Sequence, residues 1–283
     1  MTSAKATTQA PFARKASRKL PALLSFCALL VGCATETERT PLPAYLSISD
    51  RDALQIIATR QSAIKTVSAR CDIVLTDPQG QTVNLDGALL AMPATASGPK
   101  VRLRAWKLGQ AVFDITLTDG EAWLIAPDNP RINNPDNTSG QAQTARRIAE
   151  TLDFIGPSFF QSAKIVSTTP TTITASSAYT NLTRILCVID RATLTPQRFT
   201  AGGTAIKAAA TSELLLLDYR IIGTIPSLPS SLPMPSSLSI PWAHRLQLTS
   251  PGGSVIVEMS EVEINAELPP SAFVPPTRAR RLP

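Results

Sequence analysis

The sequence is poor in the residues that most active sites use. It has one histidine in 283 residues, and His244 stands in "WAHRLQL" without a cysteine or acidic residue at the spacing of metal ligands. His244 shares one face of a predicted strand with Leu246 and Leu248. A hydrogen-bonded strand histidine is therefore favoured over a metal ligand or a general base, and no metal site is predicted.

Sequence motifs of catalysis and cofactor binding are also missing. The chain has no G-x-S-x-G, no phosphate-binding loop and no G-x-G-x-x-G, and Ser158 in "GPSFF" has no partner that would activate it. Glu258, Glu261 and Glu263 lie near the end of a predicted strand, which is typical of a solvated face rather than of paired catalytic carboxylates. We therefore predict no catalytic residue and no cofactor, and we do not expect an enzyme.

No apolar run reaches the roughly 20 residues that a transmembrane helix needs. The run "LPALLSFCALLVGC" (residues 20–33) is too short, and the segment before it has five basic and no acidic residues. That arrangement predicts an export signal. Its ending, "LVGC", resembles a bacterial lipobox, whose cysteine receives a diacylglyceryl group and becomes the new N-terminus. An ordinary signal peptide that happens to contain two cysteines is the alternative.

The lipobox divides the chain into a lipoprotein signal peptide (1–32), the lipidated Cys33 with a linker (33–48) and one β-rich domain (49–283). Several acyl chains on Cys33 would hold the mature protein firmly on a membrane, because a single chain binds only marginally. Ala34 follows the cysteine, where lipoproteins kept at an inner membrane often have Asp. The periplasmic face of the outer membrane is therefore the expected location.

The basic character of the chain belongs mostly to the signal segment. Removing the five basic residues of that segment from the 27 in the whole chain leaves 22, against 21 acidic residues. The mature protein is thus nearly neutral and lacks the basic face that nucleic-acid binding requires. We expect no nucleic-acid partner, and we expect a monomer.

Two cysteines, Cys71 and Cys187, remain after Cys27 leaves with the signal and Cys33 is modified. Each lies in a strand-like segment. In an oxidising compartment the pair can form a disulfide. Small buried thiols would suit the same two positions, and the sequence leaves both alternatives open because it does not give the distance between the Cα atoms.

Hydrophobic periodicity predicts one helix followed by antiparallel strands. Residues 47–67 carry a helical stripe with Ser49 or Asp50 as the cap; the stripe consists of Leu54, Ile57, Ala58, Gln61 and Ile64. The period then changes to two, with turn signals about every 8–12 residues. In "AVFDITLT", one face holds Ala111, Phe113, Ile115 and Leu117, and the other holds Asp114, Thr116 and Thr118. The pattern predicts a mainly β (α+β) fold, in which a curved antiparallel sheet has a few helices packed into its concavity.

Two segments between the strands have distinct roles in this prediction. A second helical stripe is expected to cover the apolar face of the sheet; it comprises Ala145, Ile148, Ala149, Leu152, Phe154, Ile155, Phe159 and Phe160. Residues 226–241, "PSLPSSLPMPSSLSIP", contain five prolines and six serines. Because proline at that density prevents ladder pairing, this segment is predicted to be an insertion loop outside the sheet.

The order of these pieces resembles the LolA/LolB-like lipoprotein carriers and receptors, including their lipidated relatives. An amphipathic helix precedes "TVSARCDIVL", later strands contain "DITLTDGEAWLIAPD", and the chain closes with "INAELPPSAFVPP", where a strand runs into an Asn and a docked Phe. The resemblance spans most of residues 50–276. It implies an incomplete antiparallel β-barrel with helices as a lid over an apolar cavity that receives acyl chains.

Two positions depart from the relatives. Soluble LolA-like carriers often have a basic residue before the proline that ends an early strand, and this chain has Met92 there. Anchored LolB-like receptors touch the membrane with an exposed apolar loop between two strands. Residues 107–111 are predicted instead to form a tight turn without such a loop.

The resemblance and the sorting of faces together predict the lining of the cavity: Val83, Leu85, Leu89, Leu103, Phe113, Ile115, Leu117, Trp123, Ile148, Leu152 and Phe154. The implied protein is a membrane-anchored periplasmic lipoprotein that binds acyl chains or lipoproteins and assists lipoprotein localisation to the outer membrane. A periplasmic sensor or protein-interaction module on the same fold is the alternative. Asp114, on the opposite face, is expected to be dispensable.

Overall fold

The computed structural model describes residues 45, 47–93, 99–125, 157–178, 183–203, 212–226 and 237–281. All of them belong to one compact unit, residues 40–283. The predicted signal peptide, Cys33, the helical stripe over residues 145–155 and residues 227–236 of the predicted loop lie outside the described residues. Within the described part, no helix is both long enough and apolar enough to cross a membrane.

The described elements are three short helices and thirteen strands. In chain order they are α1 (Asp50–Ser62), β1 (Val67–Thr76), β2 (Thr82–Met92), β3 (Lys100–Lys107), β4 (Gln110–Thr118), β5 (Glu121–Ile125), α4 (Pro157–Ser162), β6 (Lys164–Thr168), β7 (Thr172–Ala178), β8 (Thr183–Asp190), β9 (Thr195–Gly203), β10 (Ser212–Pro226), β11 (Ser237–Ser250), β12 (Gly253–Ile264), the 3-10 helix η2 (Pro270–Phe273) and β13 (Arg280–Arg281).

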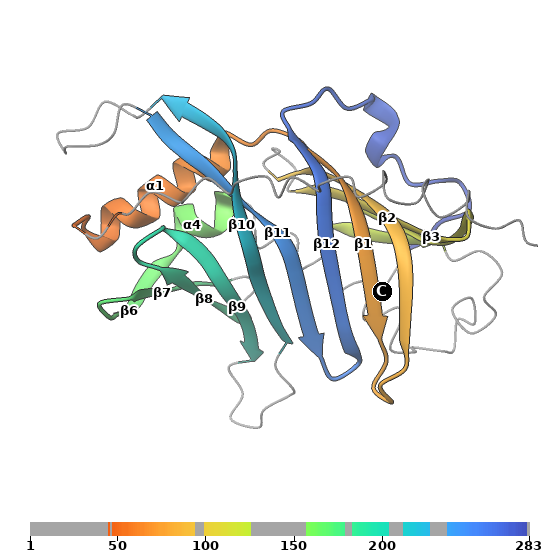
Figure 1. Ribbon diagram of the computed structural model, residues 1–283, viewed down its shortest axis with the longest axis horizontal. Coiled ribbons are helices and arrows are strands. Elements are labelled where there is room, and N and C mark those ends of the chain that lie inside the picture. The colour runs from red at the N-terminus through yellow and green to blue at the C-terminus, as the bar shows by residue number, and fades with distance from the viewer. Residues whose placement is uncertain are drawn as a thin grey trace, which may run out of the picture. The chain divides into compact units, whose positions relative to one another are not determined.

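The strands form one antiparallel sheet in the order β13-β5-β4-β3-β2-β1-β12-β11-β10-β9-β8-β7-β6. Consecutive strands pair from β1 to β5 and from β6 to β12; β12 also pairs with β1, and β13 pairs with β5. Figure 1 shows β10, β11, β12, β1 and β2 side by side in the middle of the sheet. The sheet ends at β13 and β6 and is not closed into a barrel, so the predicted fold class is confirmed.

Helix α1 begins at a polar cap and buries one side. Ser49 is its N-cap, and its Oγ accepts a hydrogen bond from the backbone N–H of Asp52 at 3.2 Å. Asp50 and Asp52 lie in the first turn and Arg60 in the last, which suits the helix dipole at both ends. The buried residues include Leu54, Ile57 and Gln61 of the predicted stripe. The main contacts of α1 are with α4 and β11, and α4 also contacts β7.

The face of β4 that carries Asp114, Thr116 and Thr118 is also largely buried. Thr116 is 1% and Thr118 8% exposed. Helix η2 packs against β3 and β4, and its Ala272 carbonyl accepts a hydrogen bond from Arg102 Nη1 at 3.0 Å. Arg102 also holds Asp114 through two hydrogen bonds, at 3.0 and 2.7 Å. Asp114 is therefore part of a largely buried ion pair that docks η2, which gives a structural reason to expect that Asp114→Ala lowers stability.

The closing motif "INAELPPSAF" docks as the sequence suggested. Asn265 has a positive φ of 58°, and its side chain accepts a hydrogen bond from Lys65 N at 2.7 Å and donates one to Ala63 O at 3.1 Å. It thereby ties the end of β12 to the connection between α1 and β1. Phe273, the docked Phe, is only 7% exposed.

The predicted loop over residues 226–241 is wrong at both of its ends. Pro226 pairs with Ser237, and residues 237–241 form the start of β11. Pro241 lies opposite Ile221, beside a register shift between Ile221 and Gly223. A bulge is one of the few places in a sheet that accepts proline, because the ladder is already interrupted there. Proline density alone therefore overestimated the length of the loop.

Candidate functional site

Six of the predicted cavity residues form one continuous apolar surface across three neighbouring strands. The register places Leu89 opposite Leu103 and Leu103 opposite Ile115, and antiparallel partners point to the same side of a sheet. We call this surface the β2–β4 apolar face; it consists of Leu85, Leu89, Leu103, Phe113, Ile115 and Leu117. Each of the six is buried, with no more than 8% exposed.

The other predicted lining residues are distributed differently. Val83 lies on the same side of β2 but near the strand end, and it is 40% exposed. Trp123 is opposite Thr116, whereas Leu124 is opposite Ile115, so Trp123 lies on the other side of the sheet and its assignment to the cavity is wrong. Ile148, Leu152 and Phe154 lie outside the described residues.

Leu124 is the residue that the sequence prediction missed. It is 6% exposed and continues the β2–β4 apolar face onto β5. The signal that identifies it is the "DG" turn: Thr118 pairs with Glu121 across Asp119 and Gly120, and both turn residues have positive φ. A two-residue turn of that kind fixes the register of the following strand, and hence which of its residues face inward.

The two cysteines of the described sheet are buried and unbridged. Cys71 and Cys187 are both buried free thiols, so of the two alternatives that the sequence left open the structure has the unbridged one. Burial raises the pKa of the Cys71 thiol to about 12 and that of Cys187 well above its ordinary value. Neither thiol is thus a thiolate nucleophile at neutral pH.

The remaining candidate groups have structural roles. His244 is 8% exposed, and its Nδ1 donates a hydrogen bond to Met259 O at 3.1 Å, as predicted for a strand histidine. Glu258 and Glu261 are exposed and pair with Arg245 and Arg70, each at 3.1 Å. Among the described residues no group of three His, Cys, Asp or Glu side chains is arranged to hold a metal ion.

The turn between β3 and β4 carries an exposed leucine. Lys107 pairs with Gln110, so only Leu108 and Gly109 form the turn, as the sequence predicted. Leu108 has a positive φ of 51° and is 93% exposed. An exposed apolar residue between two strands was not expected here. The sequence signal that could have indicated it is a Leu at a turn position that normally favours Asn, Asp or Gly.

A groove of about 420 Å³ lies between helix α1 on one side and α4 and β6 on the other. We call it the α1–β6 groove; it is lined by Arg51, Leu54, Gln55, Ala58, Phe160, Gln161, Ala163 and Ile165. The sequence did not predict it, because its two walls are more than a hundred residues apart in the chain.

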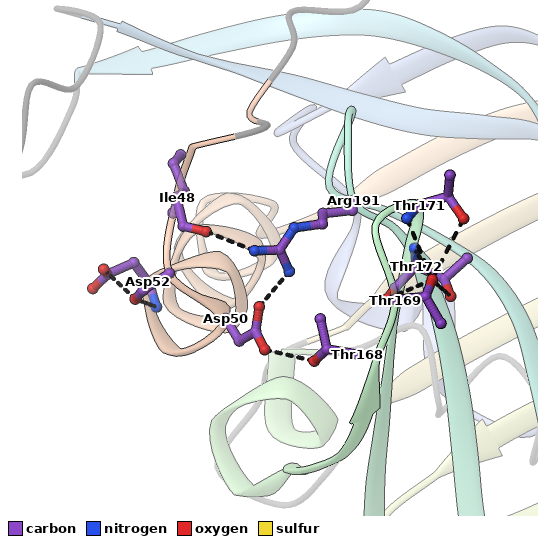
Figure 2. A network of polar contacts seen from close by, with 9 residues as sticks. Ile48, Asp50, Asp52, Thr168, Thr169, Thr171, Thr172 and Arg191 are labelled. Carbon is purple, nitrogen blue, oxygen red and sulfur yellow. Dashed lines mark hydrogen bonds and ion pairs between the residues drawn. The ribbon is translucent and has the colours of Figure 1, made fainter.

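A polar network fastens the helix to the strand beside this groove, as Figure 2 shows. Asp50, at the start of α1, accepts a hydrogen bond from Thr168 Oγ1 of β6 at 2.5 Å and forms an ion pair with Arg191. Arg191 Nη2 also donates to Ile48 O at 3.2 Å. The hydrogen bonds from Thr168 and Arg191 lower the pKa of the Asp50 carboxyl below its ordinary value.

The lowered pKa makes the contribution of Asp50 to stability depend on pH. A carboxyl with a depressed folded-state pKa stabilises the fold above its unfolded pKa, and this stability is lost as the pH falls below about 4. We expect Asp50→Asn to lower the free energy of unfolding by about 1 kcal/mol at pH 7 and by much less at pH 3.

Thermal unfolding of both proteins at the two pH values measures this difference. Glu267→Gln is the matched control, because Glu267 is exposed and the change likewise removes one negative charge; its effect should be small at both pH values. An Asp50→Asn deficit that is the same at pH 3 as at pH 7 would contradict the assigned role.

Comparisons with known proteins support the fold. No protein-family model and no curated protein matches the sequence. A solved structure of a DUF1329 family protein from Desulfovibrio piger has a TM-score of 0.50 at 8% identity and covers 79% of this chain and 96% of its own. An outer membrane lipoprotein-sorting protein domain from Vibrio parahaemolyticus has a TM-score of 0.49 at 11% identity, covering 79% and 95%.

A LolA superfamily protein from Nitrosomonas europaea has a TM-score of 0.46 at 10% identity and covers 80% of this chain and 98% of its own. Identities this low show a likeness of fold alone. At a TM-score of 0.50, the chain is similar in fold to the Desulfovibrio piger protein: a mostly antiparallel sheet, not closed into a barrel, with few helices among the described residues.

Proposed function

We propose that this protein is a lipid-anchored envelope lipoprotein that binds acyl chains on the β2–β4 apolar face and assists the localisation of other lipoproteins to the outer membrane. The observation that carries the proposal is the continuous set of buried apolar side chains on three adjacent strands of an open sheet. The main contacts of α1 and α4 are with each other, β7 and β11. Helices α1 and α4 thus pack mainly against other strands, and η2 packs on the opposite, polar face of β3 and β4.

An acyl chain suits such a face because burial of its apolar surface drives its binding. That burial contributes about 25 cal/mol per Å². The six side chains of the face carry no hydrogen-bonding group. A carboxylate or phosphate would therefore find no partner on the face, and the polar end of the ligand is expected to stay outside it.

Leu108 is an exposed apolar residue between two strands, which is the kind of feature with which anchored LolB-like receptors touch a membrane. Its side chain is almost fully exposed at the tip of the β3–β4 turn, where only a lipid surface or a partner would remove it from water. We propose that Leu108 contacts the membrane while cargo is transferred. Its strands, β3 and β4, are also two of the three that form the β2–β4 apolar face.

The lipid anchor is assigned to Cys33, because only its thiol forms the thioether of a lipobox cysteine. Metabolic labelling with a fatty-acid analogue should mark the wild-type protein and miss Cys33→Ser. Cys71→Ser is the matched control and should be labelled like the wild type, since Cys71 is buried in the sheet. Equal labelling of wild type and Cys33→Ser would rule out the anchor.

A periplasmic sensor or protein-interaction module is the second candidate, favoured by the partly polar lining of the α1–β6 groove. Mass spectrometry of what co-purifies with the Cys33→Ala protein separates the two functions. Acylated proteins or lipids in the bound material support the carrier function, and a defined complex with an unacylated protein supports the sensor.

A further inference from the structure

The strand β6 is an exposed edge with apolar side chains. It ends the sheet, and among the described strands only β7 pairs with it. All five of its residues are exposed, including Ile165 at 38% and Val166 at 51%. The opposite edge, β13, is only two residues long, and both are arginines, which discourages pairing with another chain. Strand β6 has weaker protection: a lysine at its start and a bulge at Val166.

The α1–β6 groove reaches this strand at Ile165, the one residue of β6 in its lining. Its helical wall is formed by Arg51, Leu54, Gln55 and Ala58, which occupy positions i, i+3, i+4 and i+7 on one side of α1. Ile165 of β6 lines the opposite wall together with Phe160. The hydrogen bond between Thr168 and Asp50 fixes the far end of β6 to α1. This hydrogen bond fixes strand β6 relative to α1, and thus relative to the helical wall of the groove.

The lining of the groove suits a peptide better than an acyl chain. Arg51, Gln55 and Gln161 contribute polar groups, and an acyl chain would cover them without offering any hydrogen bond. A peptide in the extended conformation offers both backbone donors and acceptors. It can pair with the free edge of β6 while placing alternate side chains against Leu54 and Phe160.

The charges beside the groove favour an acidic peptide. Arg51 and Lys164 are exposed, and neither has an ion-pair partner among the described residues. The nearby carboxylates are already engaged: Asp50 by Arg191 and Thr168, and Asp52 by Ser49 Oγ at 2.5 Å. The Ser49 hydroxyl does not neutralise Asp52, so this surface has two positive charges, Arg51 and Lys164, against one negative charge without an ion-pair partner, Asp52.

We propose that β6 and the α1–β6 groove bind an extended acidic peptide segment of a partner protein, which adds to the sheet as a further strand next to β6. Apolar side chains of the peptide pack against Leu54, Phe160 and Ile165, and an acidic side chain pairs with Arg51 or Lys164. This site lies on different strands from the β2–β4 apolar face and does not depend on acyl binding there.

The test is selection of a display library of random nine-residue peptides against the full-length protein in detergent, followed by titration of the selected peptides. We expect them to be rich in β-branched and acidic residues. Arg51→Glu should weaken their binding about tenfold or more through like-charge repulsion. Exchanging the acidic residues of the peptide for lysine should restore binding to Arg51→Glu. Lys107→Glu is the matched control, because Lys107 is an exposed lysine at the β3–β4 turn, and it should bind like the wild type.

Val166→Pro tests the backbone part of the proposal. Val166 lies at the bulge and has no partner residue on β7, so proline should be tolerated by the fold. It removes a backbone donor from the edge strand and should abolish binding, while thermal unfolding stays close to that of the wild type. Failure to select any peptide would overturn the proposal. So would selected peptides whose binding neither Arg51→Glu nor Val166→Pro changes.

Discussion

Gly253→Ala should lower the melting temperature by about 10 °C, the largest stability loss that we expect from a single methyl group. Gly253 starts β12 with a φ of +117°, and a Cβ there would lie 2.1 Å from the carbonyl oxygen of Thr76. That oxygen belongs to the backbone of β1, so it moves only if the whole β1–β12 pairing shifts. Thr76 pairs with Ser254 at this point. The expected cost is about 3 kcal/mol or more, from strain and loss of ladder pairing.

Gly80→Ala shows how much of the stability loss comes from backbone strain alone, without a steric clash. Gly80 also has a positive φ, of 82°, but nothing lies within 4 Å of the position that its Cβ would take. Its replacement should cost only about 1 kcal/mol. Thermal unfolding of the two variants beside the wild type gives the comparison. Similar losses for both variants would show that β12 does not approach β1 as closely as described.

Phe113→Glu should fold with reduced stability and lose most of its affinity for a fluorescent fatty-acyl probe. Phe113 is 8% exposed and belongs to the β2–β4 apolar face. Losing about 100 Å² of apolar contact with a ligand, at about 25 cal/mol per Å², corresponds to about 2.5 kcal/mol, or nearly a hundredfold in Kd. A face that opens to receive a ligand lets the new carboxylate keep some water, whereas a permanently dry core would not.

Gln110→Glu is the control for this variant, because it adds the same charge to β4 at an exposed position. It should change neither binding nor the melting temperature appreciably. Asp114→Ala is not a suitable control, since Asp114 holds Arg102 and through it η2. Unchanged probe binding by Phe113→Glu would place the acyl site elsewhere. A variant that does not fold at all would show that Phe113 belongs to a fixed core, which favours the interaction-module function.

The sequence was most informative where local pattern decides the structure. Strict alternation in β4 identified Phe113, Ile115 and Leu117 as one buried face, because successive strand residues must point to opposite sides. The closing Phe was also recognised as a docked residue, and Phe273 is only 7% exposed. These features depend on neighbouring residues, which a sequence displays directly.

The predictions failed where distant segments meet. Trp123 was assigned to the wrong face because its side depends on the register set by the Asp119–Gly120 turn. The polar side of β4 is buried because η2, more than 150 residues later, packs on it. The α1–β6 groove has walls more than a hundred residues apart, and Asp50 of α1 meets Thr168 of β6 across 118 residues. Local residue propensities do not encode such long-range contacts, so only the structure shows them.

The acyl-binding proposal is tested most directly by titrating the Cys33→Ser protein with a fluorescent triacylated lipopeptide. Removing the anchor cysteine leaves the β2–β4 apolar face unchanged and prevents the protein's own lipid from competing for it. The account predicts saturable binding at one site, displaced by unlabelled lipopeptide and reduced nearly a hundredfold by Phe113→Glu. A fluorescence change that rises without saturation, or that is equal in the two proteins, would contradict it.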